Sequence, residues 1–254
     1  MIGGSALKKL YTYIITSDNG QSPCYDDGIF TLACCKPQIR RMILQNYSNG
    51  IKNKTDDIWL CGIQRDNRNP FIVFLAKIYD VLRLEEYYGD NTLYSERNDC
   101  NYRNIKTLTN GNGIKKLPVK LTKEYIFKSC PDFKANPPNE HGSFENYNAF
   151  CNERSKTEQD CIIRDISGAG VLYSKQFIHC SCFNDKFALT ELLEPAFKDM
   201  LKDYKTKNRR CYHGFNKWND FYKVIPKINL GKHDNIKVLN PRTIWNKKGG
   251  CIVC

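Results

Sequence analysis

The sequence lacks several features that would place it at once in a known class. No run approaches the roughly 18 apolar residues of a membrane span, and the first residues lack the charged-then-apolar order of a signal peptide. No internal repeat is visible, which argues against solenoids and propellers. Neither the dinucleotide-binding nor the phosphate-loop glycine pattern occurs. We therefore predict a cytoplasmic protein with no integral membrane part and no cofactor.

Cysteine is too sparse for a disulfide scaffold. The chain has 13 cysteines among 254 residues, about 5%, whereas short disulfide-rich chains exceed roughly 8–10%. Their odd number and irregular spacing favour reduced thiols in the cytosol. Cys180-x-Cys182 and Cys211-x-His213, with His179 alongside, offer soft zinc ligands, but the spacing within each pair is shorter than in common zinc sites. Free thiols and no metal are the favoured prediction, and zinc stays the alternative.

Positive charge is in excess. The chain has 39 Lys and Arg against 27 Asp and Glu, a formal net charge of +12 at pH 7. This balance favours polyanions such as nucleic acid as partners, although an AT-rich genome also enriches lysine. The last four residues, Cys251 to Cys254, formally fit a lipidation signal beside Lys247 and Lys248, but the terminal cysteine is unusual there and chance composition is favoured.

The apolar pattern predicts an α+β protein. Strands are expected at 10–16, 58–64, 71–81, 161–166 and 171–178, and those at 58–64 and 71–81 are expected to form a β-hairpin. Short helices are expected at 82–88, 121–128 and 218–224. Gly89 is expected to end the 82–88 helix in the left-handed conformation. We predict one domain over 9–224, with a loop-rich insertion at about 91–160 and a basic C-terminal tail over 225–254.

The clearest helix lies between Lys186 and Tyr204, where leucines, phenylalanine and methionine repeat at helical spacing. That stripe predicts burial of one face in the core. Pro195 is tolerated in a first helical turn but disrupts a helix interior. We therefore expect this late amphipathic helix to begin at Glu194, after a short separate turn.

The segment Thr31–Arg41 (TLACCKPQIRR) is the densest in chemistry. Lys36, Arg40 and Arg41 could bind phosphate, and they could also lower the pKa of the neighbouring thiols of Cys34 and Cys35. A structural alternative is that both cysteines are small buried hydrophobes and the arginines a solvated face. The sequence leaves phosphate binding, a catalytic thiolate and this structural alternative open.

This segment belongs to a series of motifs that resembles one family. Thr31-Leu32-Ala33-x-Cys35-Lys36-Pro37-x-Ile39-Arg40-Arg41 is similar to the opening of the second type of nucleotide-modification-associated domain. Asp57-x-Trp59-Leu60-x-Gly62 resembles that family's "GDWVVG" strand, although Asp56 stands where its glycine would be. Gly89-Asp90-Asn91 resembles its "GDNIY" turn, and Asp165-x-Ser167-Gly168-x-x-Val171-Leu172-x-Ser174 its "DxSGxxVLxS" element. The resemblance spans about residues 9–187.

The resemblance implies a protein associated with hypermodified bases in nucleic acid. At the level of fold, it also resembles small β-barrel domains that hold a flipped base, so we expect a mixed, partly barrel-like sheet similar to PUA and EVE domains. Under this hypothesis the expected nucleic-acid contacts are Lys36, Arg40, Arg41, Trp59, Ser167, Gly168 and Ser174. Asp165 is the candidate acid or base and Cys35 the candidate nucleophile.

The leading hypothesis is a protein that acts on or binds modified bases in DNA. The first alternative is a non-catalytic reader of a modified base in a restriction or anti-phage setting. The second is a structural interaction module whose charge reflects composition alone. Trp59 can equally be a buried strand residue, and the residues around Gly168 can equally stabilise a turn. The sequence does not show whether the protein is an enzyme or a reader, or whether it prefers DNA or RNA. It also leaves the oligomeric state open.

Overall fold

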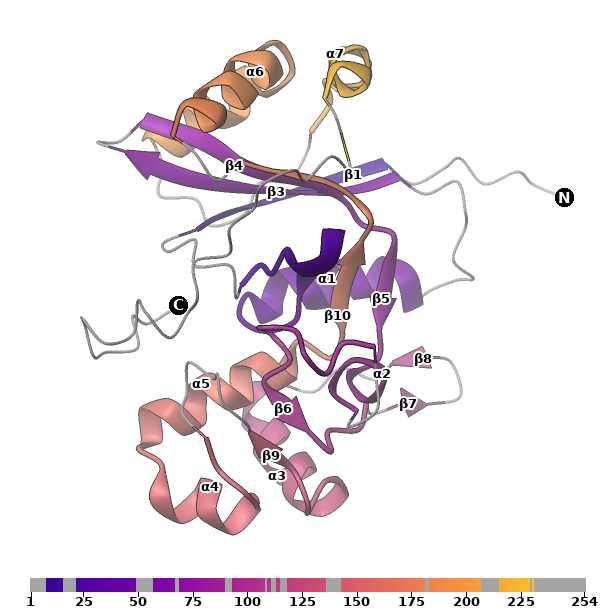
Figure 1. Ribbon diagram of the computed structural model, residues 1–254, viewed down its shortest axis with the longest axis vertical. Coiled ribbons are helices and arrows are strands. Elements are labelled where there is room, and N and C mark those ends of the chain that lie inside the picture. The colour runs from indigo at the N-terminus through magenta and orange to yellow at the C-terminus, as the bar shows by residue number, and fades with distance from the viewer. Residues whose placement is uncertain are drawn as a thin grey trace, which may run out of the picture. The chain divides into compact units, whose positions relative to one another are not determined.

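The architecture was read from a computed structural model (Figure 1). It describes residues 8–15, 22–48, 57–66, 69–89, 93–107, 109–110, 113–114, 118–135, 143–180, 183–206, 215–228 and 230. Contacts within the chain divide it into two compact units. Unit 1 comprises residues 1–18, 53–79 and 174–237, and unit 2 comprises residues 19–52, 80–173 and 238–254.

Unit 1 is built on a four-stranded sheet in the order β1-β3-β4-β11. The strands are β1 (Lys8–Ile14), β3 (Asp57–Asp66), β4 (Asn69–Lys77) and β11 (Gln176–His179). β1 runs parallel to β3, whereas β3 and β4 form the predicted antiparallel hairpin. β-branched and aromatic residues, which favour a pleated backbone, are frequent in these strands.

Two helices, α6 (Phe183–Thr206) and α7 (Trp218–Val224), cover one face of this sheet (Figure 1). α6 is the predicted late helix, but it begins well before Glu194 and contains Pro195 in its interior. The expected start was therefore wrong. An interior proline costs about 3 kcal/mol, and the burial of Leu189, Leu193 and Phe197 against the sheet offsets that cost. The short 3₁₀ helix η2 (Ile225–Lys227) follows α7.

Unit 2 is built around a small sheet in the order β2-β10-β5. Its strands are β2 (Phe30–Leu32), β10 (Val171–Ser174) and β5 (Asp80–Leu82), and helices α1 (Pro37–Ser48), α2 (Leu84–Tyr88) and α5 (Lys156–Ser167) belong to the same unit. The remaining elements are η1 (Asp26–Gly28), β6 (Tyr102–Arg103), β7 (Thr109–Asn110), β8 (Gly113–Ile114), α3 (Val119–Ser129), β9 (Lys134–Ala135) and α4 (Tyr147–Glu153). A core rich in tyrosine and phenylalanine joins α2, α3, α4 and α5.

The α+β class is confirmed, but the barrel-like expectation is not. None of the sheets in the described part of the chain closes into a barrel, since β1 and β11 form the two open edges of the larger one. A likeness to PUA or EVE domains is not confirmed. Residues 161–166, expected as a strand, lie in α5, and the run 171–178 is split between β10 and β11. Gly89 follows α2 in an extended conformation rather than a left-handed one.

Candidate functional site

The chain turns sharply between β2 and α1, in the segment singled out from the sequence. Cys35 and Lys36 both have positive φ angles, 57° and 42°. This left-handed conformation costs a residue with a side chain about 1–2 kcal/mol. Two such residues in succession persist only where the surroundings fix them, and such sites are often functional. We call this turn the Cys35–Lys36 corner.

Asp165 fixes the corner from the last turn of α5. Its Oδ1 accepts a hydrogen bond of 2.6 Å from the backbone N–H of Cys35. Its Oδ2 accepts one of 2.9 Å from the hydroxyl of Tyr102. Asp165 is only 3% exposed, and burial, followed by the Asp165 charge, raises the pKa of Tyr102. The carboxylate therefore holds the corner and β6 in place through two strong, charge-assisted bonds.

Arg40 lies behind the corner and is completely buried. Its guanidinium donates to three backbone carbonyls: Nε to Cys35 at 2.9 Å, Nη1 to Gly170 at 3.0 Å, and Nη2 to Asp165. Buried carbonyl groups need donors, and one planar fork supplies three of them at once. We refer to Arg40, Asp165, Cys35, Tyr102 and Gly170 as the Arg40–Asp165 network.

A second buried network lies at the middle of β2. The Asp99 carboxylate accepts hydrogen bonds from the hydroxyls of Thr31, at 2.6 Å, and Tyr87. Arg97 approaches Asp99 at 3.7 Å and donates to the backbone oxygens of Asp26 and Ile29. Burial raises the pKa of Asp99 even though the Arg97 charge opposes that shift. This network therefore ties the loop before β2 to α2.

The structure brings five of the predicted site residues together in unit 2. Cys35, Lys36, Arg40, Asp165 and Gly168 all belong to the corner or its network. Lys36 and the adjacent Arg41, a further predicted contact, are half-buried cations, so part of each side chain is exposed to solvent. Burial, followed by the charge of Arg40, lowers the pKa of Arg41. Lys36 and Arg41 are thus the residues whose geometry suits contact with a ligand.

Ser167 and Ser174 are buried and bonded to nearby backbone. The Ser167 hydroxyl donates to the carbonyl of Arg164 at 2.8 Å, which is a turn-stabilising contact at the end of α5. The Ser174 hydroxyl donates to the carbonyl of Gln176 and accepts from its N–H. Both serines stabilise local turns, and their predicted contact with nucleic acid stays a prediction.

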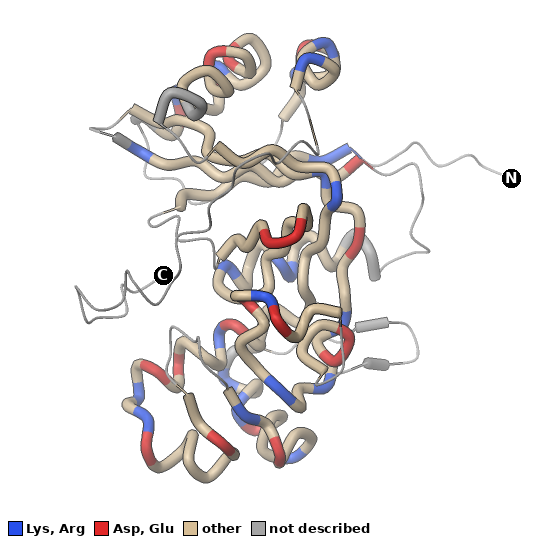
Figure 2. The backbone as a smooth tube through the Cα atoms, viewed as in Figure 1, with Lys and Arg blue, Asp and Glu red and all other residues tan. Residues whose placement is uncertain are grey.

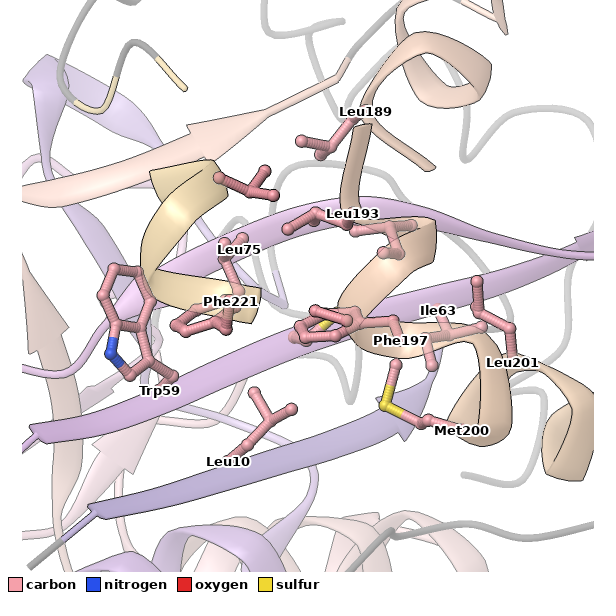
Figure 3. Close-up of a cluster of buried hydrophobic side chains, with 14 of the residues drawn as sticks. Leu10, Trp59, Ile63, Leu75, Leu189, Leu193, Phe197, Met200, Leu201 and Phe221 are labelled. Carbon is pink, nitrogen blue, oxygen red and sulfur yellow. The ribbon is translucent and has the colours of Figure 1, made fainter. Parts of the chain in front are cut away.

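Trp59 belongs to unit 1, whereas the corner belongs to unit 2. Its ring is 2% exposed and packs edge-on against Phe221 at 5.0 Å (Figure 3). Figure 3 places it at one end of the cluster formed by Leu10, Leu193, Phe197 and their neighbours. These contacts favour the structural alternative stated for Trp59, and its role in base stacking stays a prediction.

Sequence reasoning missed Tyr102, Tyr87 and Asp99, which are among the most buried polar groups of unit 2. Tyr87 and Asp99 occur near motifs that were noticed, but nothing in their spacing shows that they meet. Tyr102 lies in the region expected to be loop-rich. Its ring contacts Tyr88 and Phe133, and nothing in the sequence shows that these three aromatic residues meet.

The described residues contain no group of three or more His, Cys, Asp or Glu side chains placed to hold a metal ion. Of the suggested zinc ligands, Cys182, Cys211 and His213 lie outside the described residues, as does the Cys251–Cys254 signal. In the described part of the chain, each helix is too short or too polar to cross a bilayer.

The fold and the site define a class: an α+β protein with a strained turn before a helix, held by Asp165 and Arg40. A comparison with family models then identifies it more closely. The chain belongs to the nucleotide modification associated domain 2 family, whose model matches residues 7–224. Comparisons with curated proteins and with solved structures gave no match. The family supports a role in nucleotide modification.

Proposed function

We propose that this protein binds a nucleotide with a modified base, within DNA, at the Cys35–Lys36 corner. Lys36 and Arg41 contact the phosphate, and the base lies against the backbone of the corner. The observation that carries this proposal is the pair of left-handed residues fixed by Asp165 and Arg40. Such a preorganised turn loses little conformational entropy when a ligand binds, which is the main requirement for a small, specific site.

Electrostatics supports an anionic ligand. The chain carries a net charge of +12, and Arg41 is partly desolvated beside a second guanidinium, so its charged form is disfavoured. An anion next to Arg41 would reverse that cost, because an opposite charge stabilises the ionised form. Phosphate contacts position a ligand without reading its base. Recognition of the modification would therefore rest with the backbone of the corner.

The contacts of Asp165 favour binding over chemistry as its contribution. Both carboxylate oxygens accept hydrogen bonds from the protein itself, so the group acts through the corner, as a positioning residue. A catalytic acid or base has to reach the reacting atom. The pairing of Asp165 with Cys35 as acid or base and nucleophile remains a prediction, which product analysis addresses.

The test is a binding measurement with matched oligonucleotides that differ only in one 5-hydroxymethylcytosine. Wild-type protein should bind the modified strand more tightly, and Lys36→Gln and Arg41→Gln should each weaken binding to both strands. Lys128→Gln, at an exposed position of α3 paired with Glu124, is the matched control and should leave affinity unchanged. Equal affinity of the wild type for both strands, together with no effect of the two substitutions, would contradict the proposal. Mass spectrometry of the recovered strands distinguishes a reader from an enzyme, which leaves a new base mass.

A further inference from the structure

Helix α7 carries a half-buried pair of aromatic side chains that the corner does not involve. Trp218 and Tyr222 are four residues apart, so they lie on one face of the helix. Their rings stack with centroids 5.8 Å apart and planes inclined by 25°. Phe221, between them in sequence, points instead into the buried cluster of unit 1 and stacks on Phe197. Trp218 and Tyr222 pack at the border of the same cluster, with the Trp218 ring edge-on against Phe215 at 4.9 Å, and part of each side chain is exposed to solvent.

Three lysines lie on helix α7 or approach it. The Nζ atom of Lys8 lies 5.0 Å from the centroid of the Tyr222 ring, and Lys217 and Lys223 stand at the beginning and end of α7, both exposed. Lys223 makes only an exposed 3.4 Å contact with Asp220, and such pairs contribute little. Figure 2 shows lysine colouring on α7 and at the start of β1. We call Lys8, Lys217, Trp218, Tyr222 and Lys223 the α7 patch.

A partly buried carboxylate orients the patch. Asp57, at the start of β3, accepts a 2.5 Å hydrogen bond from the Tyr222 hydroxyl and forms a 2.8 Å ion pair with Lys77. In register, Asp57 stands opposite Lys8 on β1. Lys77 offsets the charge of Asp57, and Asp220 is the carboxylate that contacts a lysine of the patch, Lys223. The result is a cationic surface around fixed aromatic rings.

We propose that the α7 patch binds single-stranded nucleic acid, with a base stacked on Trp218 and the adjacent phosphates held by Lys8, Lys217 and Lys223. Stacking on aromatic side chains beside a cationic surface is the general means of holding single strands without regard to sequence. A duplex keeps its bases stacked on one another and offers no face to the ring. The inference rests on the proposed function, because it names single-stranded nucleic acid as the substrate class of a protein that binds a modified nucleotide.

The experiment uses the full chain and a fluorescein-labelled oligothymidylate of about 12 nucleotides, a length within known single-strand site sizes. Trp218→Ala should weaken binding about tenfold, the usual effect of losing one stacked base. The triple variant Lys8→Gln, Lys217→Gln, Lys223→Gln should lower the slope of log affinity against log salt by about 0.7 for each lysine.

One control and one independent variant keep the outcome decisive. Lys120→Gln, at an exposed position of α3, should leave the salt slope unchanged. Because the three patch lysines are exposed, the triple variant tests the proposal even if Trp218→Ala does not fold. Unchanged affinity and salt slope in the patch variants overturn it, as does binding to anionic vesicles in place of the oligonucleotide. Plain oligothymidylate contains no modified base, so a failure here is separate from a failure of modified-base preference at the corner.

Discussion

Gly168 lies directly against the guanidinium of Arg40. A Cβ atom at position 168 would stand 2.2 Å from Arg40 Cζ, well inside any real contact distance. The backbone of Gly168 is helical, with φ −62°, so it needs glycine for space and not for conformation. Gly168 of the "DxSG" motif and Arg40 of the TLACCKPQIRR segment, which lie far apart in sequence, therefore pack directly against each other.

Gly168→Ala should displace Arg40 and lower the free energy of unfolding by about 2–4 kcal/mol, because three buried carbonyls then lose their donor. Ala169→Gly is the neighbouring control. Ala169 has a φ of 64°, which glycine adopts without strain, so that variant should be neutral or slightly stabilised. Urea unfolding measures both. Equal stability of Gly168→Ala and wild type would mean that the Arg40–Asp165 network does not stabilise unit 2.

The two adjacent arginines should differ sharply when each is replaced by methionine. Arg40→Met removes a fully buried donor to three carbonyls and should cost about 3 kcal/mol of unfolding free energy. Arg41→Met alters a half-exposed side chain and should cost less than about 1 kcal/mol. Oligonucleotide affinity should show the reverse order among folded variants. Urea titration and fluorescence anisotropy check the pair, and similar losses of stability at both positions would contradict the assignment.

Lys36→Gly should separate stability from binding. Glycine adopts the φ of 42° at this position without the steric cost that a lysine side chain incurs. We expect the variant to be as stable as wild type or more stable by up to about 1 kcal/mol, while its affinity for oligonucleotides falls because the cation is gone. A gain in stability coupled to a loss of binding is typical of a strained functional residue. Unimpaired binding would remove Lys36 from the proposed site.

Asp57 predicts a specific loss of stability in acid. Burial alone would raise its pKa, but the hydrogen bonds from Lys77 and Tyr222 and the Lys77 charge outweigh it, so the net shift is downward. A depressed pKa in the folded state means that the ionised carboxylate adds stability above its unfolded pKa of about 4, and that this stability disappears as the pH falls through the folded value. Because Asp57 is partly exposed, its effect after solvent screening is about 0.5–1 kcal/mol.

Urea unfolding of Asp57→Asn against wild type, followed from neutral pH to about pH 3, measures that contribution. The difference between the two proteins should shrink as the pH falls. A constant difference over the whole range would show that the carboxylate charge has no part in holding α7 and β4 together.

The fold was predictable where a regular pattern of apolar residues extended over a long segment. The stripe from Leu189 to Tyr204 identified α6, and the runs on either side of residues 65–70 identified the β3–β4 hairpin. Residues 161–166 were misassigned because a short apolar run fits either a strand or a buried helix turn. Ser155 and Glu158, which form a capping box at the start of α5, were the available signal for a helix there.

The site was predictable only in part. The TLACCKPQIRR segment was correctly singled out, but its charges alone did not show that Arg40 is buried while Arg41 is partly exposed. That difference depends on the carbonyls of Asp165 and Gly170, which lie 125 and 130 residues further along the chain. No local spacing encodes such a contact. The expected start of α6 at Glu194 was likewise wrong, because local rules disfavour an interior proline whereas tertiary packing keeps Pro195 inside the helix.

The most direct test of the central claim is photocrosslinking of the full chain with a photoreactive nucleotide that carries a 5-substituted pyrimidine, followed by peptide mapping. A mononucleotide avoids the longer-strand contacts expected at the α7 patch. The account predicts that the label attaches within residues 34–41, and that Lys36→Gln or an excess of unlabelled modified nucleotide suppresses it. Labelling confined to other peptides, or unaffected by either treatment, would contradict binding at the Cys35–Lys36 corner.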